Sequence, residues 1–328
     1  MTRSAAGGSR DDDAGAPPVG VLVMAYGTPA RFEDVEEFYL DVRRGRPPTP
    51  EQLEELRRRY AAVGGISELS ARTAEQVAGV QAALDRTSPG MFACRYGAKH
   101  ARPKIEDAVD AFAATGVRRV VGIVLAPHYS SASIGEYVER ASSRAAARQM
   151  EARFIEDWHD DPALVELLAE RVRRSISELQ SAGAPGDIEL LVTAHSLPMR
   201  VIDSGDGYDR RLAETAELVA AAVPASRYRV CWQSAGRTPE PWVGPDVLDV
   251  LRAIAAERTV EPPGAVGSVV ICPAGFTSDH LEVNYDLDIE ARSLAAELGL
   301  GFARTASLNA DERLCSALGR LIEATARS

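Results

Sequence analysis

The sequence predicts an α/β protein of two lobes, each built on a parallel sheet with helices on both faces, with a functional site in the cleft between them. Three observations support this prediction. The chain has 328 residues, which suits two domains of about 150 residues each. Short apolar runs rich in β-branched residues alternate with amphipathic helical patterns, as in parallel sheets. Finally, three segments of the first half have counterparts, in the same order, in the second half.

The strands are expected where apolar runs are short, and the helices where apolar residues recur with a period of 3.6. The predicted strands are Val19–Ala25, Met91–Tyr96, Val117–Ala126, Arg153–Glu156, Asp187–Ala194, Tyr228–Trp232 and Val266–Cys272. The predicted helices are Pro50–Val63, Ser70–Leu84, Lys104–Ala114, Glu136–Met150, Pro162–Ala182 and Tyr208–Val223. We therefore expect a first lobe over residues 19–160, a second over 161–306 and a C-terminal helix over 307–328. Residues 1–18, rich in Gly, Ala and Asp, are expected to be a disordered tail, the alternative being an ordered arm.

The internal matches suggest that the two lobes share one fold. Leu22–Pro29 matches Leu191–Pro198, and Ala126–Ser131 resembles Pro273–Ser278, with Phe92–Tyr96 and Arg229–Gln233 forming the third pair. Chance similarity between generic strand–turn segments is the alternative. Ligands of open parallel sheets bind beyond the carboxyl ends of the strands. If the lobes are equivalent, Tyr26 and His195 lie at equivalent strand ends and face each other across the cleft.

Composition excludes several classes of protein. The formal net charge of −11 argues against broad nucleic-acid binding, which needs a basic face. No apolar run approaches the roughly 18 residues that span a bilayer, and the N-terminus lacks the apolar core of a signal peptide. We therefore expect a cytoplasmic protein without membrane insertion. The cysteines at 94, 231, 272 and 315 form no C-x-C or C-x-x-C pair and are interpreted as buried thiols rather than metal ligands or disulfides.

Two motifs of the second half carry side chains suited to metal and proton chemistry. His195 directly follows the predicted strand 187–194, where a histidine can ligate a metal or accept a proton near neutral pH. A hydrogen-bonded turn histidine is the alternative. Glu282 follows the predicted strand Val266–Cys272, where it suits an oxygen ligand, with His280 placed to orient it. The alternative for Glu282 is structural, because it lies three residues after Asp279 in the spacing of a helix capping box.

Basic residues of the first half suggest an anion site. Three arginines fall within Arg43–Arg46, and Lys99 follows the second predicted strand. Arginine pairs well with carboxylates. A solvated basic turn and an ordinary surface lysine are the respective alternatives.

Nine segments together resemble the ferrochelatase family, in order along the chain from about residue 19. They are Met24–Pro29, Arg43–Arg46, Arg59–Ser67, Gly97–His100, Leu125–Ser130, His195–Pro198, Trp232–Gly236, Pro241–Asp246 and Gly275–Glu282. Two positions depart from the family pattern: Glu68 stands where proline is usual, and Ala235 where glutamate is common. The resemblance implies two Rossmann-like lobes of the class II chelatase type, with the C-terminal helix packing back on the first.

The resemblance also implies roles for individual residues. His195 and Glu282 match the family's iron-binding and catalytic pair, and Tyr26 matches the axial ligand of the product iron in coproporphyrin-type enzymes. Positions that match porphyrin contacts are Arg43, Arg59, Tyr60, Ser67 and Tyr137. Arg46 and Lys99 are further candidates to hold propionates. Ferrous iron and a porphyrin would be substrates, and no prosthetic group is expected. Some relatives hold a [2Fe–2S] cluster through a C-x-C motif near the C-terminus, but only Cys315 occurs in that region, so no cluster is expected.

The resemblance therefore implies insertion of ferrous iron into coproporphyrin III, giving coproheme in haem biosynthesis. Protoporphyrin IX is the alternative substrate. A cobalt chelatase of cobalamin synthesis and a non-catalytic haem-binding protein are further alternatives; relatives of the first kind show a more histidine-rich site, whereas this chain has five histidines. We expect a monomer, with transient contacts to neighbouring haem-pathway enzymes.

Overall fold

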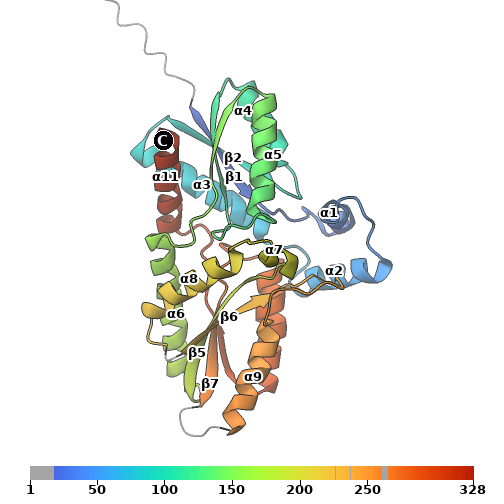
Figure 1. The fold of residues 1–328 in the computed structure, drawn as a ribbon, viewed down its shortest axis with the longest axis vertical. Helices are drawn as coiled ribbons and strands as arrows, with labels where there is room; N and C mark the ends of the chain where they lie inside the picture. The colour runs from blue at the N-terminus through green and yellow to red at the C-terminus, as the bar shows by residue number, and fades with distance from the viewer. Residues whose placement is uncertain (1–17, 226, 237, 261–264) are drawn as a thin grey trace, which may run out of the picture.

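The structure, a computed structural model, describes residues 18–225, 227–236, 238–260 and 265–328. The predicted disordered tail therefore lies, apart from its last residue, outside the described residues. The described chain forms two four-stranded parallel sheets, which lie one above the other in Figure 1. The predicted fold class, α/β with two parallel sheets and helices, is confirmed.

Both sheets have the same strand order. The first, β2-β1-β3-β4, contains β1 (Val19–Ala25), β2 (Phe92–Ala98), β3 (Arg119–Val124) and β4 (Glu151–Ile155). The second, β6-β5-β7-β8, contains β5 (Asp187–His195), β6 (Arg227–Gln233), β7 (Val266–Cys272) and β8 (Gly301–Arg304). In each order the first strand lies between the second and the third, so the internal sequence matches correspond to equivalent strands. β1 and β7 are buried along their whole length, as expected for strands covered by helices on both faces.

The helices follow the strands along the chain. Their bounds are α1 (Val35–Val42), α2 (Pro50–Ala62), α3 (Leu69–Thr87), α4 (Ile105–Ala114), α5 (Ile134–Ala147), α6 (Pro162–Ser181), α7 (Met199–Asp203), α8 (Tyr208–Ala221), α9 (Val247–Val260), α10 (Arg292–Glu297) and α11 (Glu312–Arg327), with a short 3₁₀ turn at Phe32–Asp34. A π-helix, η2 (Val283–Ala291), precedes α10. Local sequence fixes several starts: Thr49 forms a capping box with Gln52 ahead of Pro50, and Asp161 accepts from two backbone amides ahead of Pro162. Such N-caps contribute about 1 kcal/mol each.

The last helix joins the two halves of the chain. α11 packs against α3 of the first lobe and against α6 of the second (Figure 1). Its Leu314, Leu318 and Ile322 are fully buried in the core shared with these helices. α1 and α2 instead extend to one side of the lobes in Figure 1.

Several elements were absent from the sequence prediction: the 3₁₀ turn, α1, α7, α9, α10, β8 and the π-helix. α1 is only eight residues long and β8 only four, too short to show a clear period. The remaining predicted boundaries shift by a few residues at most. Among the described residues, no helix is long and apolar enough to cross a membrane. All four cysteines are free thiols, three of them buried and Cys94 half-buried.

Candidate active site

A cavity of about 410 Å³ lies between the carboxyl ends of the two sheets. It is lined at the end of β1 by Tyr26, at the end of β5 by His195 and in the loop after β7 by Phe276 and Thr277. Aromatic rings make up much of its wall: Tyr26, Phe38, Tyr39, Tyr60, Tyr137, Tyr208 and Phe276. The cavity therefore suits a large, flat, mostly apolar molecule, as ligand pockets at such strand ends do.

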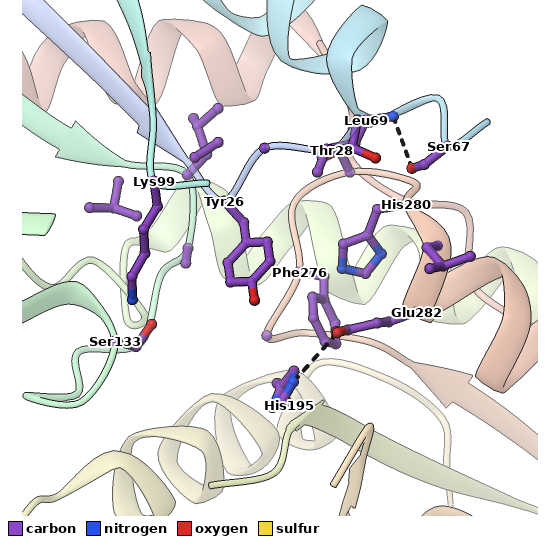
Figure 2. A pocket seen from close by; sticks show the side chains of 18 of the residues that line it. Tyr26, Thr28, Ser67, Leu69, Lys99, Ser133, His195, Phe276, His280 and Glu282 are labelled. Carbon is purple, nitrogen blue, oxygen red and sulfur yellow. Dashed lines mark hydrogen bonds and ion pairs between the residues drawn. The ribbon is translucent and has the colours of Figure 1, made fainter. Parts of the chain in front are cut away.

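His195 and Glu282 face each other in this cavity. His195 Nε2 lies 3.5 Å from Glu282 Oε1. The other ring nitrogen, Nδ1, donates to the carbonyl oxygen of Ser196 over 2.5 Å, which fixes the ring orientation. Nε2 is therefore the nitrogen that is presented to the cavity. Figure 2 shows this pair on one side, with the phenol of Tyr26 reaching toward it from the first lobe.

The pair is charged at neutral pH. Burial of the His195 ring opposes its protonation, but the Glu282 carboxylate outweighs this and raises the pKa of His195 to about 9. Burial likewise disfavours a charge on Glu282, but His195 lowers the pKa of that carboxyl to about 2. The pair thus holds an imidazolium and a carboxylate. A cation that binds here displaces one proton.

The backbone around His195 is held by close packing and hydrogen bonds. Gly275 lies against β5: a Cβ at this position would sit 2.4 Å from the Ala194 Cβ, so only glycine lets the loop after β7 approach His195. The buried Tyr208 hydroxyl donates to the carbonyl oxygen of His195 over 3.1 Å. The sequence analysis did not identify Tyr208, since this contact joins α8 to the end of β5, 13 residues earlier in the chain.

The capping-box interpretation of Glu282 is wrong. The Asp279 side chain does not cap the following helix; it accepts from Ser307 Oγ, Asn309 Nδ2 and Arg304 Nη1. Glu282 itself makes no capping hydrogen bond. His280 does not orient Glu282 through its Nδ1, because this nitrogen accepts a hydrogen bond from the Val283 backbone amide instead. Glu282 therefore does not serve as a helix cap, and its carboxylate faces His195.

Glu282 stands at the start of the π-helix, which aligns three carboxylates. The wider turn of a π-helix brings residues four apart close to one face, and Glu282, Asp286 and Glu290 all line a second cavity of about 290 Å³. Burial and the neighbouring Glu282 raise the pKa of Asp286 to about 7, although Ser234 donates to it. The sequence analysis missed Asp286 and Glu290, although their spacing from Glu282 is visible in the sequence.

Tyr26 approaches the pair from the first lobe. It directly follows β1, and the next residue, Gly27, has a φ of +89° that turns the chain away from the sheet. The Tyr26 ring lies 4.7 Å from the His100 ring, centre to centre, and His100 Nδ1 lies 2.7 Å from Asp41 Oδ2. Burial raises the pKa of the Tyr26 phenol, with Glu282 adding to the effect, so the phenol is neutral in the resting protein. The residue as a whole is nevertheless 43% exposed.

Four other residues predicted from the sequence also line the cavity: Tyr60, Ser67, Lys99 and Tyr137. The Tyr60 hydroxyl lies 3.2 Å from Thr28 Oγ1, and Ser67 Oγ accepts from the Leu69 amide over 3.3 Å (Figure 2). The Lys99 Nζ lies 5.0 Å from the centre of the Tyr137 ring. These contacts bring α2, α5 and the loop after β2 to one site.

The arginines that the sequence suggested as porphyrin or propionate contacts, Arg43, Arg46 and Arg59, do not line this cavity. Arg43 and Arg46 occupy the turn after α1, where each side chain donates to the other's carbonyl oxygen, outside the cavity lining. Arg59 lines the second cavity, 3.2 Å from Asp286 Oδ1 and stacked on Tyr285. Their contact with a porphyrin stays a prediction.

Two solved chelatase structures share this fold. The chain matches SirB from Bacillus subtilis with Fe³⁺ at a TM-score of 0.55 and 13% identity, over 94% of this chain and 96% of that one. A sirohydrochlorin chelatase SirB from Bacillus subtilis subspecies spizizenii in complex with cobalt matches at a TM-score of 0.56 and 12% identity, with the same coverage. At these identities the match concerns the fold alone.

Sequence relatives are more similar. The chain is 40% identical over 306 residues to a coproporphyrin III ferrochelatase of Geobacillus sp. (strain WCH70), covering 93% of this chain and 96% of the relative. It is 41% identical over 322 residues to a ferrochelatase of Thermus thermophilus, covering 93% and 98%. The family model for ferrochelatase matches residues 18–326. A family match over nearly the whole chain, with relatives of this similarity, confirms the resemblance: the chain belongs to the ferrochelatase family.

Proposed function

We propose that this protein inserts ferrous iron into coproporphyrin III to form coproheme. The observation that carries the proposal is the His195–Glu282 pair, 3.5 Å apart inside an aromatic-lined cavity. The relatives named coproporphyrin III ferrochelatase, about 40% identical over most of the chain, support the choice of metal and porphyrin.

The chemistry requires both members of the pair. A free-base porphyrin carries two pyrrole N–H groups, which must lose their protons as iron enters the ring. Glu282 offers an oxygen ligand, and His195 Nε2 offers a nitrogen ligand or a proton acceptor once it has lost its own proton; ferrous iron accepts such a mixed set. A cation beside Glu282 favours this deprotonation, since it repels the imidazolium charge. Asp286 and Glu290 form a polar route for iron and protons between Glu282 and solvent.

The remaining residues grip the porphyrin. The rings of Tyr60, Tyr137 and Phe276 cover its faces, and Lys99 meets a propionate at the rim. Tyr26 lies opposite the His195–Glu282 pair and is placed to coordinate the product iron. Catalysis comes from binding a bent macrocycle better than a flat one. Protoporphyrin IX is the second candidate substrate, because it shares the ring and two of the carboxylates.

The first prediction concerns substrate choice. In side-by-side turnover, coproporphyrin III is expected to be metallated with a kcat/KM at least about tenfold above that of protoporphyrin IX, since two extra charge-assisted contacts add roughly 1.5 kcal/mol or more. The assay follows the porphyrin absorbance under anaerobic conditions with ferrous iron. A preference for protoporphyrin IX would overturn the assignment of coproporphyrin III.

We also propose that the protein is a cytoplasmic monomer without an iron–sulfur cluster. Its four thiols come from β2, β6, β7 and α11 and are mostly buried, and burial raises the pKa of each, which disfavours the thiolate that a cluster needs. Purified porphyrin-free protein should show no absorbance band above about 400 nm, where Cys-ligated clusters absorb. A brown sample that releases acid-labile sulfide would contradict this, and sedimentation at the mass of two chains would contradict the monomer.

A further inference from the structure

One carboxylate in the first lobe bridges two cations beside the cavity. Glu136, in the first turn of α5, lies 2.7 Å from Lys99 Nζ through Oε2 and accepts from Arg44 through Oε1. Lys99 lies in the loop after β2, and Arg44 in the turn after α1. Three separate elements thus meet at this carboxylate.

Lys99 belongs to two hollows at once. It lines the main cavity, and together with Glu136, Arg44 and Glu139 it lines an outer hollow of about 880 Å³. Figure 2 shows Lys99 on the far side of Tyr26 from Glu282, next to Ser133. A carboxylate at this rim of a bound molecule therefore meets a lysine that already has a carboxylate partner.

This arrangement has an energetic consequence. A ligand carboxylate that binds an unpaired lysine adds an ion pair, whereas one that binds Lys99 replaces the pair with Glu136. Replacing the existing ion pair gains much less free energy than adding a new one. Burial disfavours the charge of Glu136, but Lys99 and Arg44 lower the pKa of its carboxyl, so it stays ionised and competes at neutral pH.

We propose that Glu136 is a built-in competitor for the substrate's carboxylate at Lys99 and Arg44, and that it thereby limits how tightly the protein holds a propionate-bearing porphyrin. The inference rests on the proposed function for the identity of the ligand. The long, flexible side chain of Lys99 can swing from Glu136 to a propionate without movement of the backbone. The exchange keeps the grip on the porphyrin moderate, so that the metallated product, which carries the same carboxylates, leaves.

The test is a set of binding titrations with free-base coproporphyrin III in the absence of iron, followed by porphyrin fluorescence. Glu136→Gln should lower the Kd about threefold to fivefold, the scale of a partly exposed ion pair, because it leaves both cations without their competitor. Lys99→Met should raise the Kd. In the Glu136→Gln/Lys99→Met double variant most of the gain should vanish, since of the two cations it is Lys99 that lines the main cavity.

Glu139→Gln is the matched control. It removes the same charge from the same helix and the same outer hollow, but Glu139 forms no ion pair with Lys99 or Arg44. Its Kd should stay within about 1.5-fold of the wild type, because a solvated charge contributes little. At about 0.5 M salt the gain of Glu136→Gln should shrink, as screening requires.

An unchanged or weaker affinity of Glu136→Gln would overturn the inference, the latter showing that Glu136 only orients Lys99. An equal gain from Glu139→Gln would also overturn it, since the effect would then be one of net charge. These outcomes are separate from a failure of the proposed function, in which the wild type binds coproporphyrin III normally but does not metallate it.

Discussion

Replacing His195 with alanine is expected to abolish iron insertion while leaving porphyrin binding largely intact. The substitution removes the nitrogen that faces the cavity and with it the ion-pair partner of Glu282. Of the cavity residues that we propose to contact the porphyrin, Tyr60, Lys99 and Tyr137 come from the first lobe, and the substitution leaves them untouched. Loss of a group that moves protons and binds metal lowers turnover by at least roughly a hundredfold.

The measurement is anaerobic turnover of His195→Ala beside a fluorescence titration with free-base porphyrin. The expected pattern is a Kd within about threefold of the wild type, as distant contacts predict, and no detectable insertion. Loss of porphyrin binding together with activity would mean that His195 holds the macrocycle rather than acting on iron and protons. Turnover close to the wild type would remove His195 from the mechanism.

Glu282→Gln is expected to lower kcat by at least roughly a hundredfold, the scale of a lost electrostatic or acid–base group. The amide keeps the size of the side chain but removes the charge that, in our proposal, neutralises iron. Because Asp279 does not cap the helix and Glu282 makes no capping bond, the interaction lost is the ion pair with His195, and stability should fall by about 1 kcal/mol, the scale of a partly exposed pair. Glu290→Gln is the matched control: it removes the same charge two turns further along, outside the main cavity, and should cost less than about tenfold.

The Glu282→Gln variant also carries a pH signature. Only neutral His195 can bind iron or accept a pyrrole proton, so kcat/KM for iron should rise with pH through the pKa of His195, about 9 in the wild type. The Glu282 carboxylate is what raises this pKa above its ordinary value of 6.5. Without that charge the residual activity should rise at a lower pH, by more than one unit. A rising limb at unchanged pH, or near-normal turnover, would sink the catalytic assignment of Glu282.

Much of the fold could be predicted from the sequence because the central strands are apolar and short. β1 and β7 lie where their runs of valine and isoleucine predicted them, since strands buried on both faces have no polar positions to blur the pattern. The internal matches predicted two lobes of one fold for a related reason, because equivalent strands require equivalent residues, and the two sheets have the same strand order. β8, only four residues long and half-buried, carries no such signal.

The candidate site could be predicted only in part. His195, Glu282 and Tyr26 follow strand ends, and the topology alone brings strand ends together. The π-helix, in contrast, depends on tertiary contacts such as Arg304 with Asp279 and Asp288, which link residues up to 25 positions apart. The partner of Glu136 is equally invisible in the sequence, because Lys99 lies on another element. The Arg43–Arg46 run was conspicuous, yet two of its arginines bond to backbone within their own turn.

The central claim is that the His195–Glu282 pair makes this cavity a site of metal insertion rather than of porphyrin binding alone. The most direct test is a single-turnover experiment in which the wild-type protein, loaded with coproporphyrin III, is mixed with ferrous iron under anaerobic conditions while absorbance is followed. The account predicts conversion of the free-base spectrum to that of iron coproporphyrin, one per loaded site. A complex that keeps its free-base spectrum in the presence of ferrous iron would contradict the account.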